Sequence, residues 1–481
     1  MTSLSEPKTY RIKSFGCQMN VYDGERMAEL LGAQGMSAAP EGGDADLVVL
    51  NTCHIREKAA EKVYSDIGRL RREDGSAPLI AVAGCVAQAE GEEIMARSPD
   101  VKMVVGPQAY HRLPGMIEKA RRGERVTDTD MPANAKFDVL PGRTKRAPSA
   151  FLTVQEGCDK FCTYCVVPYT RGAEISRPFA DLVEEAKRLV DAGAREITLL
   201  GQNVNAWDGE DDKGRAVGLD GLIRALAALP DLQRIRYTTS HPNDMSDALI
   251  AAHGEIDKLM PYLHLPVQSG SNRVLAAMNR SHSAESYIEL IERFRAARPD
   301  IAISGDFIVG FPGETDAEFE DTLKMVDTIR YAAAFSFKYS PRPGTPAATM
   351  ENQIAKEVMD ERLKRLQAAL QRDSLAFNQR SVGKTCEVLV ERKGRKPGQW
   401  LGKTPWLQSA WFEANAAIGD VVKVELVAAG PNSLEARVLS SPPVSRGRME
   451  SHASSAIRIS PIGPCATSSS IVAGGTVGFD G

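Results

Sequence analysis

Residues 151–165 read FLTVQEGCDKFCTYC, an apolar run typical of a buried strand, followed at once by closely spaced cysteines. Cys158, Cys162 and Cys165 have the spacing C-x3-C-x2-C. Cysteine sulfur is the usual protein ligand of iron–sulfur clusters, so these thiolates can hold three corners of a four-iron cluster. The fourth iron is then open to a small molecule. The sequence therefore predicts a reactive cluster in this loop.

Two other uses of such cysteines fit less well. Zinc sites normally add a second Cys or His pair, and none follows at finger spacing. Disulfide frameworks are typical of short secreted chains, whereas this chain has 481 residues and 8 cysteines. The N-terminus has no apolar signal core, and no apolar run approaches the length of a membrane helix. We therefore expect a cytoplasmic protein with reduced thiols.

The composition is ordinary for a globular chain, with 43% hydrophobic and 25% charged residues. The length predicts about three domains. The formal net charge of −4 gives no overall attraction to nucleic acid. A nucleic-acid contact would therefore need a local basic patch.

Segment 8–125 alternates predicted strands with predicted helices, which is typical of a doubly wound α/β domain. The strands are expected at 10–16, 46–51, 79–84 and 103–106. Residues 126–147 have weak periodicity and several breaks, which indicates a linker.

Cys17, Cys53 and Cys85 directly follow the first three of these strands. The carboxyl ends of parallel strands lie along one edge, where ligands bind, so these distant thiols should converge. A single cysteine there is most often a small buried apolar residue, and inert packing is the alternative. The repetition at one topological position favours a second three-thiolate cluster.

Segment 148–375 contains six predicted β/α repeats, two short of a closed eight-fold barrel, and so predicts a partial (β/α)6 barrel. Its strands are expected at 151–157, 196–201, 234–239, 263–267, 301–310 and 334–339. Parallel-barrel enzymes react at the loops that follow the strands. Those loops are polar or glycine-rich here, which predicts a cofactor pocket at that end.

An amphipathic helix at 356–380 leads to segment 378–441, whose short strands predict a small β-barrel. One turn of this barrel carries four cations that suit a phosphate backbone, with a solvated hairpin tip as the alternative. They are Arg392, Lys393, Arg395 and Lys396.

Trp400, Trp406 and Trp411 either stack on a base or pack in the core of the small barrel. Residues 442–481 are rich in Ser, Gly and Pro and are predicted to be disordered. Cys386 and Cys465 have no partners by spacing and are predicted not to be ligands.

The order of the motifs resembles the radical SAM (S-adenosylmethionine) methylthiotransferase family over about residues 8–440. The motifs are FGCQMN, NTCHIREKA, GCVAQAEG, EGCDKFCTYCVVPYTRG, LLGQNVNAW, LHLPVQSGS and DFIVGFPGET. The NTC-x-IREKA and CVVPYTRG-x-x-x-SRP runs resemble the branch that modifies isopentenylated adenosine in tRNA. The resemblance implies an N-terminal methylthiotransferase domain, a radical SAM barrel and a C-terminal TRAM β-barrel that binds RNA.

The resemblance also implies the reaction. SAM binds the open iron of the Cys158/Cys162/Cys165 4Fe-4S cluster and is cleaved by one electron to a 5′-deoxyadenosyl radical. A radical is needed because the C2–H of adenine is neither acidic nor activated, and the cofactor supplies this chemistry. A second 4Fe-4S cluster on Cys17, Cys53 and Cys85 holds or provides the sulfur, and a second SAM gives the methyl group. N6-isopentenyladenosine on the 3′ side of the anticodon becomes its 2-methylthio derivative.

The resemblance assigns further residues to cofactor binding. Phe161 and Tyr164 would shield the cluster and could pack against the adenine of SAM, with simple packing of the loop as the alternative. Gly201 and Gln202 match the position that binds the methionine amino group. The adenosine-binding stretch would contain Ile308, Gly310 and Glu314.

Arg171 could hold a carboxylate or an RNA phosphate, or form a structural salt bridge. His241 and His264 are predicted to be hydrogen-bonded pocket residues and not ligands. The implied partners are tRNA, an electron donor such as flavodoxin or ferredoxin, and the iron–sulfur assembly machinery, with the chain itself a monomer away from membranes.

Two alternatives stay open at this point. One is a sibling methylthiotransferase acting on threonylcarbamoyladenosine in tRNA or on a ribosomal-protein aspartate. The other is a non-catalytic iron–sulfur protein that binds RNA or carries electrons.

Overall fold

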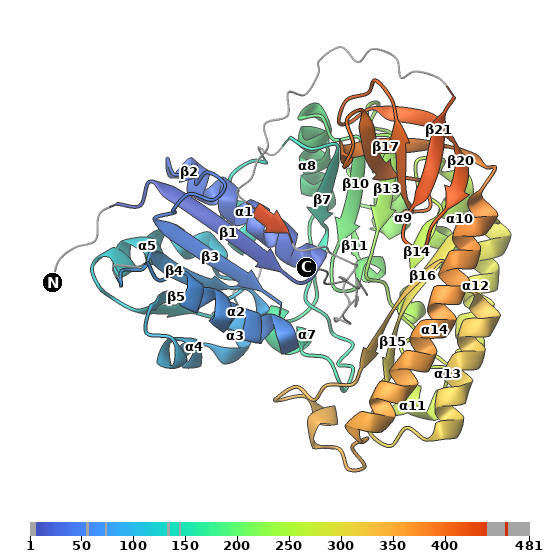
Figure 1. Cartoon of the computed structure of the whole chain (residues 1–481), viewed down its shortest axis with the longest axis horizontal. Coiled ribbons are helices and arrows are strands. Elements are labelled where there is room, and N and C mark those ends of the chain that lie inside the picture. The colour runs from blue at the N-terminus through green and yellow to red at the C-terminus, as the bar shows by residue number, and fades with distance from the viewer. Residues whose placement is uncertain are drawn as a thin grey trace, which may run out of the picture.

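The computed structural model describes residues 6–53, 57–72, 75–131, 135–143, 146–439 and 457–459. An N-terminal α/β domain faces a half-open barrel, and a small closed β-barrel packs on one end of it (Figure 1). No helix in the described part of the chain is long and apolar enough to cross a membrane.

The N-terminal domain is built on a parallel sheet with the strand order β2-β1-β3-β4-β5-β6. The strands are β1 (Thr9–Phe15), β2 (Ser37–Ala38), β3 (Leu47–Thr52), β4 (Leu79–Ala83), β5 (Val101–Val105) and β6 (Val126–Asp128). Every residue of β3 and β4 is buried, as their continuous apolar runs predict for strands covered on both faces.

Helices cover both faces of this sheet, which confirms the doubly wound fold. Apolar residues of α1 (Gln18–Ala33) and α5 (Leu113–Arg121) form a core against one face. The other face carries α2 (Glu57–Arg69), α3 (Cys85–Glu90) and α4 (Glu92–Arg97).

Two stretches differ from their predicted state. The predicted linker 126–147 is partly regular, because β6 pairs with β5 and α6 (Ala135–Val139) follows it. In the predicted disordered tail, β22 (Ile457–Ile459) pairs in parallel with β1. The rest of 442–481, including Cys465, lies outside the described residues.

The central domain has six parallel strands at the predicted positions. They are β7 (Ser149–Thr153), β10 (Glu196–Leu200), β13 (Arg234–Tyr237), β14 (Tyr262–His264), β15 (Ala302–Val309) and β16 (Ala333–Lys338). They pair in the orders β13-β10-β7 and β14-β15-β16, with a parallel bridge between Ile235 and Leu259 near the junction.

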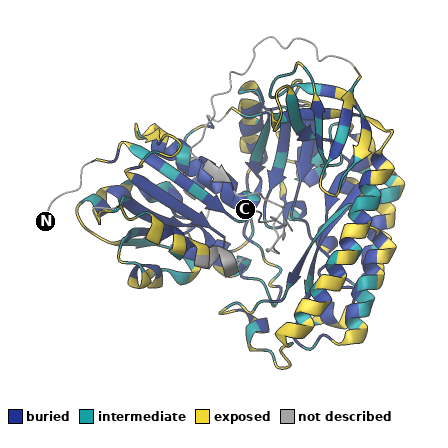
Figure 2. Ribbon diagram, viewed as in Figure 1, coloured by how far each residue is buried: buried dark blue, intermediate teal, exposed yellow. Residues whose placement is uncertain are grey.

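Helices line the outside of these strands, with buried strands within and exposed helix faces outside (Figure 2). They are α8 (Phe179–Asp191), α9 (Leu219–Ala227), α10 (Asp247–Glu255), α12 (Ala284–Ala297) and α13 (Asp316–Ile329). The partial (β/α)6 barrel is thereby confirmed, and α14 (Lys356–Ser381) packs along β16 at its edge.

Short elements in the loops were not predicted, because they are too brief to show periodicity. They are the helices α7 (Val167–Arg171) and α11 (Asn272–Ala277) and two antiparallel strand pairs, β8 (Gln155–Glu156) with β9 (Ile175–Ser176) and β11 (Asp208–Glu210) with β12 (Ala216–Gly218).

The C-terminal strands close into a barrel of the order β17-β18-β19-β21-β20, as predicted. They are β17 (Thr385–Lys393), β18 (Gln399–Lys403), β19 (Ser409–Glu413), β20 (Val421–Ala429) and β21 (Leu434–Val438). Arg234 and Arg236 of β13 donate to the carbonyls of Lys403 and Pro405, each at 2.8 Å. Two buried guanidinium groups thus fasten the small barrel to the central domain.

Candidate active site

One cavity of about 940 Å³ is lined by both cysteine triads. Its thiols are Cys17, Cys53, Cys85, Cys158, Cys162 and Cys165. The cavity lies where the carboxyl ends of β1, β3 and β4 face the loops that follow the barrel strands. The predicted convergence of the first triad therefore holds, and the two triads open on the same space.

The first triad depends on a close approach of two loops. Gly16 has φ +115°, and a Cβ there would lie 2.3 Å from the Cβ of Cys53. Only glycine combines that backbone conformation with this contact. Burial raises the pKa of Cys85, while Arg171 opposes the rise by its charge and by a hydrogen bond.

The second triad sits in a loop held by backbone hydrogen bonds. Cys158 N donates to Gly172 O at 3.2 Å, and Cys165 N donates to Cys162 O at 2.9 Å. Burial raises the pKa of Cys158 to about 11 and that of Cys165 to about 12, and the neighbouring thiol of Cys162 adds to both shifts.

Hydrogen-bond donors are aimed at the sulfurs of this triad. Arg280 Nη1 donates to Cys162 Sγ at 3.8 Å, and Val167 N donates to Cys165 Sγ at 3.5 Å. Within the described residues, no set of three or more His, Cys, Asp or Glu side chains is arranged to hold a single metal ion. A four-iron cluster spreads its thiolates further than one ion does. The donor set and the cavity therefore fit iron–sulfur clusters better than a zinc site.

Polar atoms without partners surround the cavity. In the described part of the chain, buried atoms of seven lining residues make no hydrogen bond: Arg171 Nη1, Asn203 Oδ1, Thr238 Oγ1, Ser240 Oγ, Arg280 Nε, Asp306 Oδ1 and Tyr339 OH. Most buried polar groups in proteins are paired, so a ring of unpaired ones indicates a ligand. These residues follow or end several different barrel strands, as expected for a barrel active site.

Four of the predicted cofactor residues line this cavity: Tyr164, Gly201, Gln202 and Ile308. Gln202 Oε1 accepts from Gly157 N at 2.6 Å, and Gln202 N donates to Gln155 Oε1 at 2.9 Å. These bonds tie the loop after β10 to the start of the cysteine loop.

Gly310, Glu314 and Phe161 are not among the residues that line the cavity, and their cofactor contacts stay predictions. Gly310 has φ +72°, and a Cβ there would lie 2.2 Å from Met359 Cγ of α14. Glu314 Oε2 accepts from Gly310 N at 2.7 Å and from Arg362 Nη1 at 2.8 Å. Met359 of α14 lines the cavity, so Gly310 and Glu314 lie directly behind a lining side chain and hold it in place.

Phe161 is 52% exposed and is not among the residues that line the cavity. Its predicted packing against cluster or cofactor therefore has no support from the geometry.

The two predicted pocket histidines are hydrogen-bonded. His241 lines the cavity, and its Nδ1 accepts from Asn243 N at 3.3 Å. Burial lowers the pKa of His241 to about 2, with Arg280 and Lys160 adding to the shift, so the ring is neutral at pH 7. His264 Nδ1 lies 3.1 Å from Ser304 Oγ.

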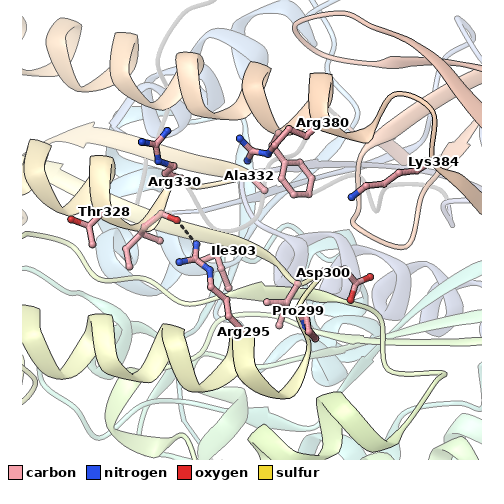
Figure 3. Close-up of a pocket in the computed structure, with 12 residues that line it drawn as sticks. Arg295, Pro299, Asp300, Ile303, Thr328, Arg330, Ala332, Arg380 and Lys384 are labelled. Carbon is pink, nitrogen blue, oxygen red and sulfur yellow. Dashed lines mark hydrogen bonds between the residues drawn. The ribbon is translucent and has the colours of Figure 1, made fainter.

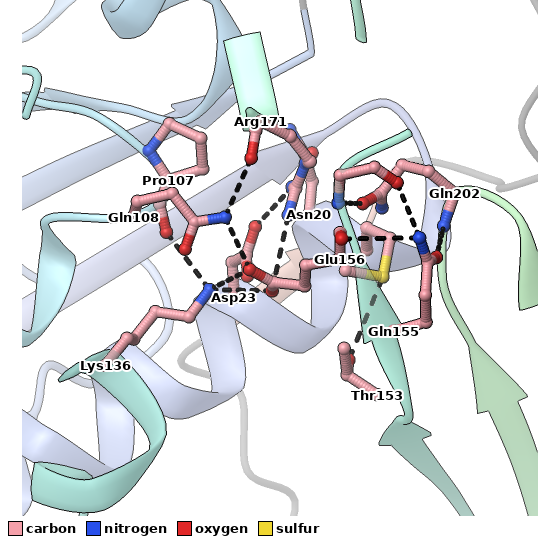
Figure 4. A network of polar contacts seen from close by, with 12 residues as sticks. Asn20, Asp23, Pro107, Gln108, Lys136, Thr153, Gln155, Glu156, Arg171 and Gln202 are labelled. Carbon is pink, nitrogen blue, oxygen red and sulfur yellow. Dashed lines mark hydrogen bonds and ion pairs between the residues drawn. The ribbon is translucent and has the colours of Figure 1, made fainter. Parts of the chain in front are cut away.

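A buried polar network joins the N-terminal domain to the central domain (Figure 4). Arg171 Nη2 lies 2.6 Å from Asp23 Oδ2, which makes Arg171 a structural ion pair and not an RNA contact. Lys136 Nζ of α6 lies 2.5 Å from Glu156 Oε2, and Gln108 Nε2 donates to the same atom at 2.7 Å. Nothing in the sequence pattern singled out Asp23, Lys136 or Glu156, because isolated charges carry no periodicity.

A second cavity, of about 620 Å³, lies at the opposite end of β15 and β16 (Figure 3). Four cations line it: Arg295, Arg330, Arg380 and Lys384. No cysteine is among its lining residues, so it is separate from the cluster site.

The predicted RNA-binding cations of the small barrel, Arg392, Lys393, Arg395 and Lys396, are all exposed at the β17–β18 turn. Trp400 Nε1 donates to Ala414 O at 3.0 Å and Trp406 Nε1 to Asp300 Oδ2 at 3.2 Å, so both indoles serve packing. Cys386 lies in the barrel core, away from both triads.

Comparisons with known proteins match this architecture part by part. The model of the Radical SAM superfamily matches residues 152–326, that of the Uncharacterized protein family UPF0004 matches 9–106, and that of the TRAM domain matches 379–439. The fold and the site thus define a radical SAM protein, a class whose members carry a 4Fe-4S cluster and bind SAM.

Full-length relatives identify one family within the radical SAM class. The chain is 79% identical to a tRNA-2-methylthio-N(6)-dimethylallyladenosine synthase of Novosphingobium aromaticivorans, over 91% of this chain and 98% of the relative. It is 67% identical to the protein of the same name from Zymomonas mobilis, over 90% and 97%. The chain therefore belongs to the family of tRNA-2-methylthio-N(6)-dimethylallyladenosine synthases.

A solved structure supports the fold. The radical S-adenosylmethionine methyltransferase TsrM from Kitasatospora setae, solved with cobalamin and a 4Fe-4S cluster, is 13% identical with a TM-score of 0.53. The match covers 71% of this chain and 77% of that one.

Proposed function

We propose that this chain is a tRNA methylthiotransferase that converts N6-isopentenyladenosine, on the 3′ side of the anticodon, to 2-methylthio-N6-isopentenyladenosine. The observation that carries the proposal is the single cavity lined by both cysteine triads. A transfer of sulfur to an unactivated carbon needs a radical source and a sulfur source close to one substrate position. Membership in a family whose relatives bear this activity in their names supports the same conclusion.

Cys158, Cys162 and Cys165 are proposed to hold the 4Fe-4S cluster to which SAM binds. When bound, that group supplies the electron that cleaves SAM to the 5′-deoxyadenosyl radical. The residues of the chain orient and shield the bound SAM. In this proposal Gly201 and Gln202 border its methionine end, while Tyr164 and Ile308 form an apolar part of the cavity wall. The neutral His241 and the unpaired Asp306 Oδ1 are hydrogen-bonding groups for bound ligands.

Cys17, Cys53 and Cys85 are proposed to hold a second 4Fe-4S cluster, which holds or provides the sulfur, while a second SAM gives the methyl group. The buried N–H groups of Arg171 face this triad and favour its charged form.

The substrate is tRNA, held in part by the cations of the β17–β18 turn. The remaining partners are an electron donor of the flavodoxin or ferredoxin type and the iron–sulfur assembly machinery. We place the enzyme, as a monomer, in the cytoplasm, where its tRNA substrate resides.

Mass spectrometry of tRNA nucleosides from a strain lacking this gene tests the proposal. The methylthio nucleoside should disappear while the isopentenyl nucleoside accumulates, and the intact gene should restore it. An unchanged methylthio level, or loss of a methylthiolated threonylcarbamoyladenosine instead, would overturn the assignment.

A further inference from the structure

Phe161 holds an unusual position for an aromatic residue. It lies between Cys158 and Cys162 in the cluster loop, with φ +47° and a ring that is 52% exposed. A bulky side chain at positive φ is a conformational outlier, and such outliers gather at functional sites.

The surrounding structure enforces this conformation. Asn279, itself at φ +57°, donates through Nδ2 to Phe161 O at 3.0 Å and to Lys160 O at 3.2 Å. On the other side, Thr163 Oγ1 donates to Ala277 O at 2.9 Å. The loop is therefore pinned on both flanks of Phe161, and this exposed side chain projects from a fixed main chain.

The ring stands at the rim of the cavity. Its two chain neighbours, Lys160 and Cys162, both line the cavity, whereas the ring does not. Tyr169, which is 49% exposed, follows on α7. Flat aromatic faces at the rim of a cavity with cationic neighbours are the features that bind unstacked nucleobases.

Removal of a base from its stack explains why such a ring is useful here. Enzymes that act on a base must extrude it into a pocket, which leaves the neighbouring base with an uncovered face. Aromatic side chains commonly stack on such splayed bases in RNA loops.

We propose that Phe161 stacks on an RNA base adjacent to the nucleotide that enters the cavity, and so positions the substrate. This inference rests on the proposed function, because it requires an RNA substrate. Phe161 is a positioning residue in this scheme and takes no part in the radical step.

The test uses full-length protein with its clusters and an anticodon stem-loop RNA that contains N6-isopentenyladenosine. Phe161→Leu keeps the backbone strain and most of the apolar volume but removes the aromatic face, whereas Phe161→Tyr keeps the face. Phe161→Asn removes the ring while tolerating positive φ. We expect Phe161→Leu and Phe161→Asn to weaken RNA affinity roughly 10-fold and to raise KM, since stacking on an aromatic ring contributes this much per base. Phe161→Tyr should match the wild type, and iron content and RNA-free SAM cleavage should stay unchanged throughout.

If the wild-type enzyme is active and Phe161→Leu binds the RNA as tightly as the wild type, the stacking proposal is overturned while the proposed function stands. Iron loss in both Phe161→Leu and Phe161→Asn would assign the ring to packing of the cluster loop and overturn the proposal as well. Phe161→Trp gives a direct readout, because indole emission at this position should be quenched by the RNA, and unchanged emission at saturation would contradict stacking. Failure of the wild type to bind and modify this RNA would instead overturn the proposed function.

Discussion

Arg171 of α7 and Asp23 of α1 form a buried ion pair, with 2.6 Å between Nη2 and Oδ2 and side chains 3% and 1% exposed. The same guanidinium lowers the pKa of Cys85 against the effect of burial and lies 3.7 Å from Glu156 Oε1. One side chain thus links the domain interface to the first cysteine triad.

Asp23→Asn should therefore destabilise the protein and disturb the first triad. The change leaves the Arg171 charge buried with an incomplete set of partners, which costs about 3–5 kcal/mol in comparable buried pairs. Urea denaturation should show a lower midpoint, and iron analysis should show loss at the first triad. Glu255→Gln, which breaks the exposed pair with Arg224, is the control and should change stability by less than about 1 kcal/mol. Equal effects of the two variants would contradict this account of Arg171.

Gly16→Ala should remove the first cluster while leaving the second. The new Cβ would lie 2.3 Å from Cys53 Cβ, at a backbone φ of +115°. Gly35→Ala is a matched control, since Gly35 has φ +83° but nothing within 4 Å of the added Cβ. We expect Gly16→Ala to bind about half of the wild-type iron and Gly35→Ala to bind all of it, with a loss of about 1–2 kcal/mol from backbone strain alone. Full iron content in Gly16→Ala would mean that the loops can separate without losing the cluster.

The contrast between predicted and observed site residues has a physical origin. The apolar run 46–51 and the cysteine that follows it placed Cys53 correctly, because a buried parallel strand leaves its next residue at the ligand edge. The contacts of Gly310 and Glu314 with α14 could not be predicted, because this helix lies about 50 residues further along the chain. The pairing of Lys136 with Glu156 depends on the docking of two domains, which no local pattern encodes.

Each cysteine triad should be needed for a different step of the reaction. Replacing Cys158, Cys162 or Cys165 with Ala should abolish SAM cleavage and lower iron content, because these thiolates bind the cluster that receives SAM. Replacing Cys17, Cys53 or Cys85 should leave 5′-deoxyadenosine formation measurable but stop sulfur insertion. Chromatography of 5′-deoxyadenosine and mass spectrometry of the RNA measure the two steps. Cys386→Ala, in the small-barrel core, is the control and should preserve both. Equal loss of both steps in folded variants of either triad would contradict separate roles.

Charge removal at the β17–β18 turn should weaken tRNA binding without changing the chemistry. The variant replaces four exposed cations that can contact phosphates with Gln: Arg392, Lys393, Arg395 and Lys396. Each lost phosphate contact should lower the slope of log affinity against log salt by about 0.7–0.9. Binding titrations at several salt concentrations measure this slope. Replacement of Lys119 on α5 and of Arg122 directly after it, both exposed, with Gln is the control. An unchanged slope in the turn variant would exclude this turn from the RNA interface.

His253 should make the barrel sensitive to mild acid. Its Nε2 lies 2.8 Å from Tyr237 OH in the fully buried core, and burial, followed by the charge of Arg298, lowers its pKa to about 3. The unfolded chain has a His pKa near 6.5, so between about pH 3 and 6.5 the unfolded state binds a proton that the folded state does not. The free energy of unfolding should therefore fall as the pH drops below 6.5, with His253 contributing up to about 1.4 kcal/mol per pH unit. Above pH 6.5 the contribution of His253 should not change with pH.

Urea denaturation from pH 7.5 to 4.5 in the wild type and in His253→Gln isolates this contribution. His241 and His282 are also buried with lowered pKa values, so both proteins should lose stability on acidification. His253→Gln should be less stable at pH 7.5, because a packed ring is lost. The slope of its free energy of unfolding against pH should be smaller than in the wild type by an amount that corresponds to about one bound proton. Parallel declines in the two proteins would show that His253 is protonated in the folded barrel or shielded from titration in the unfolded chain.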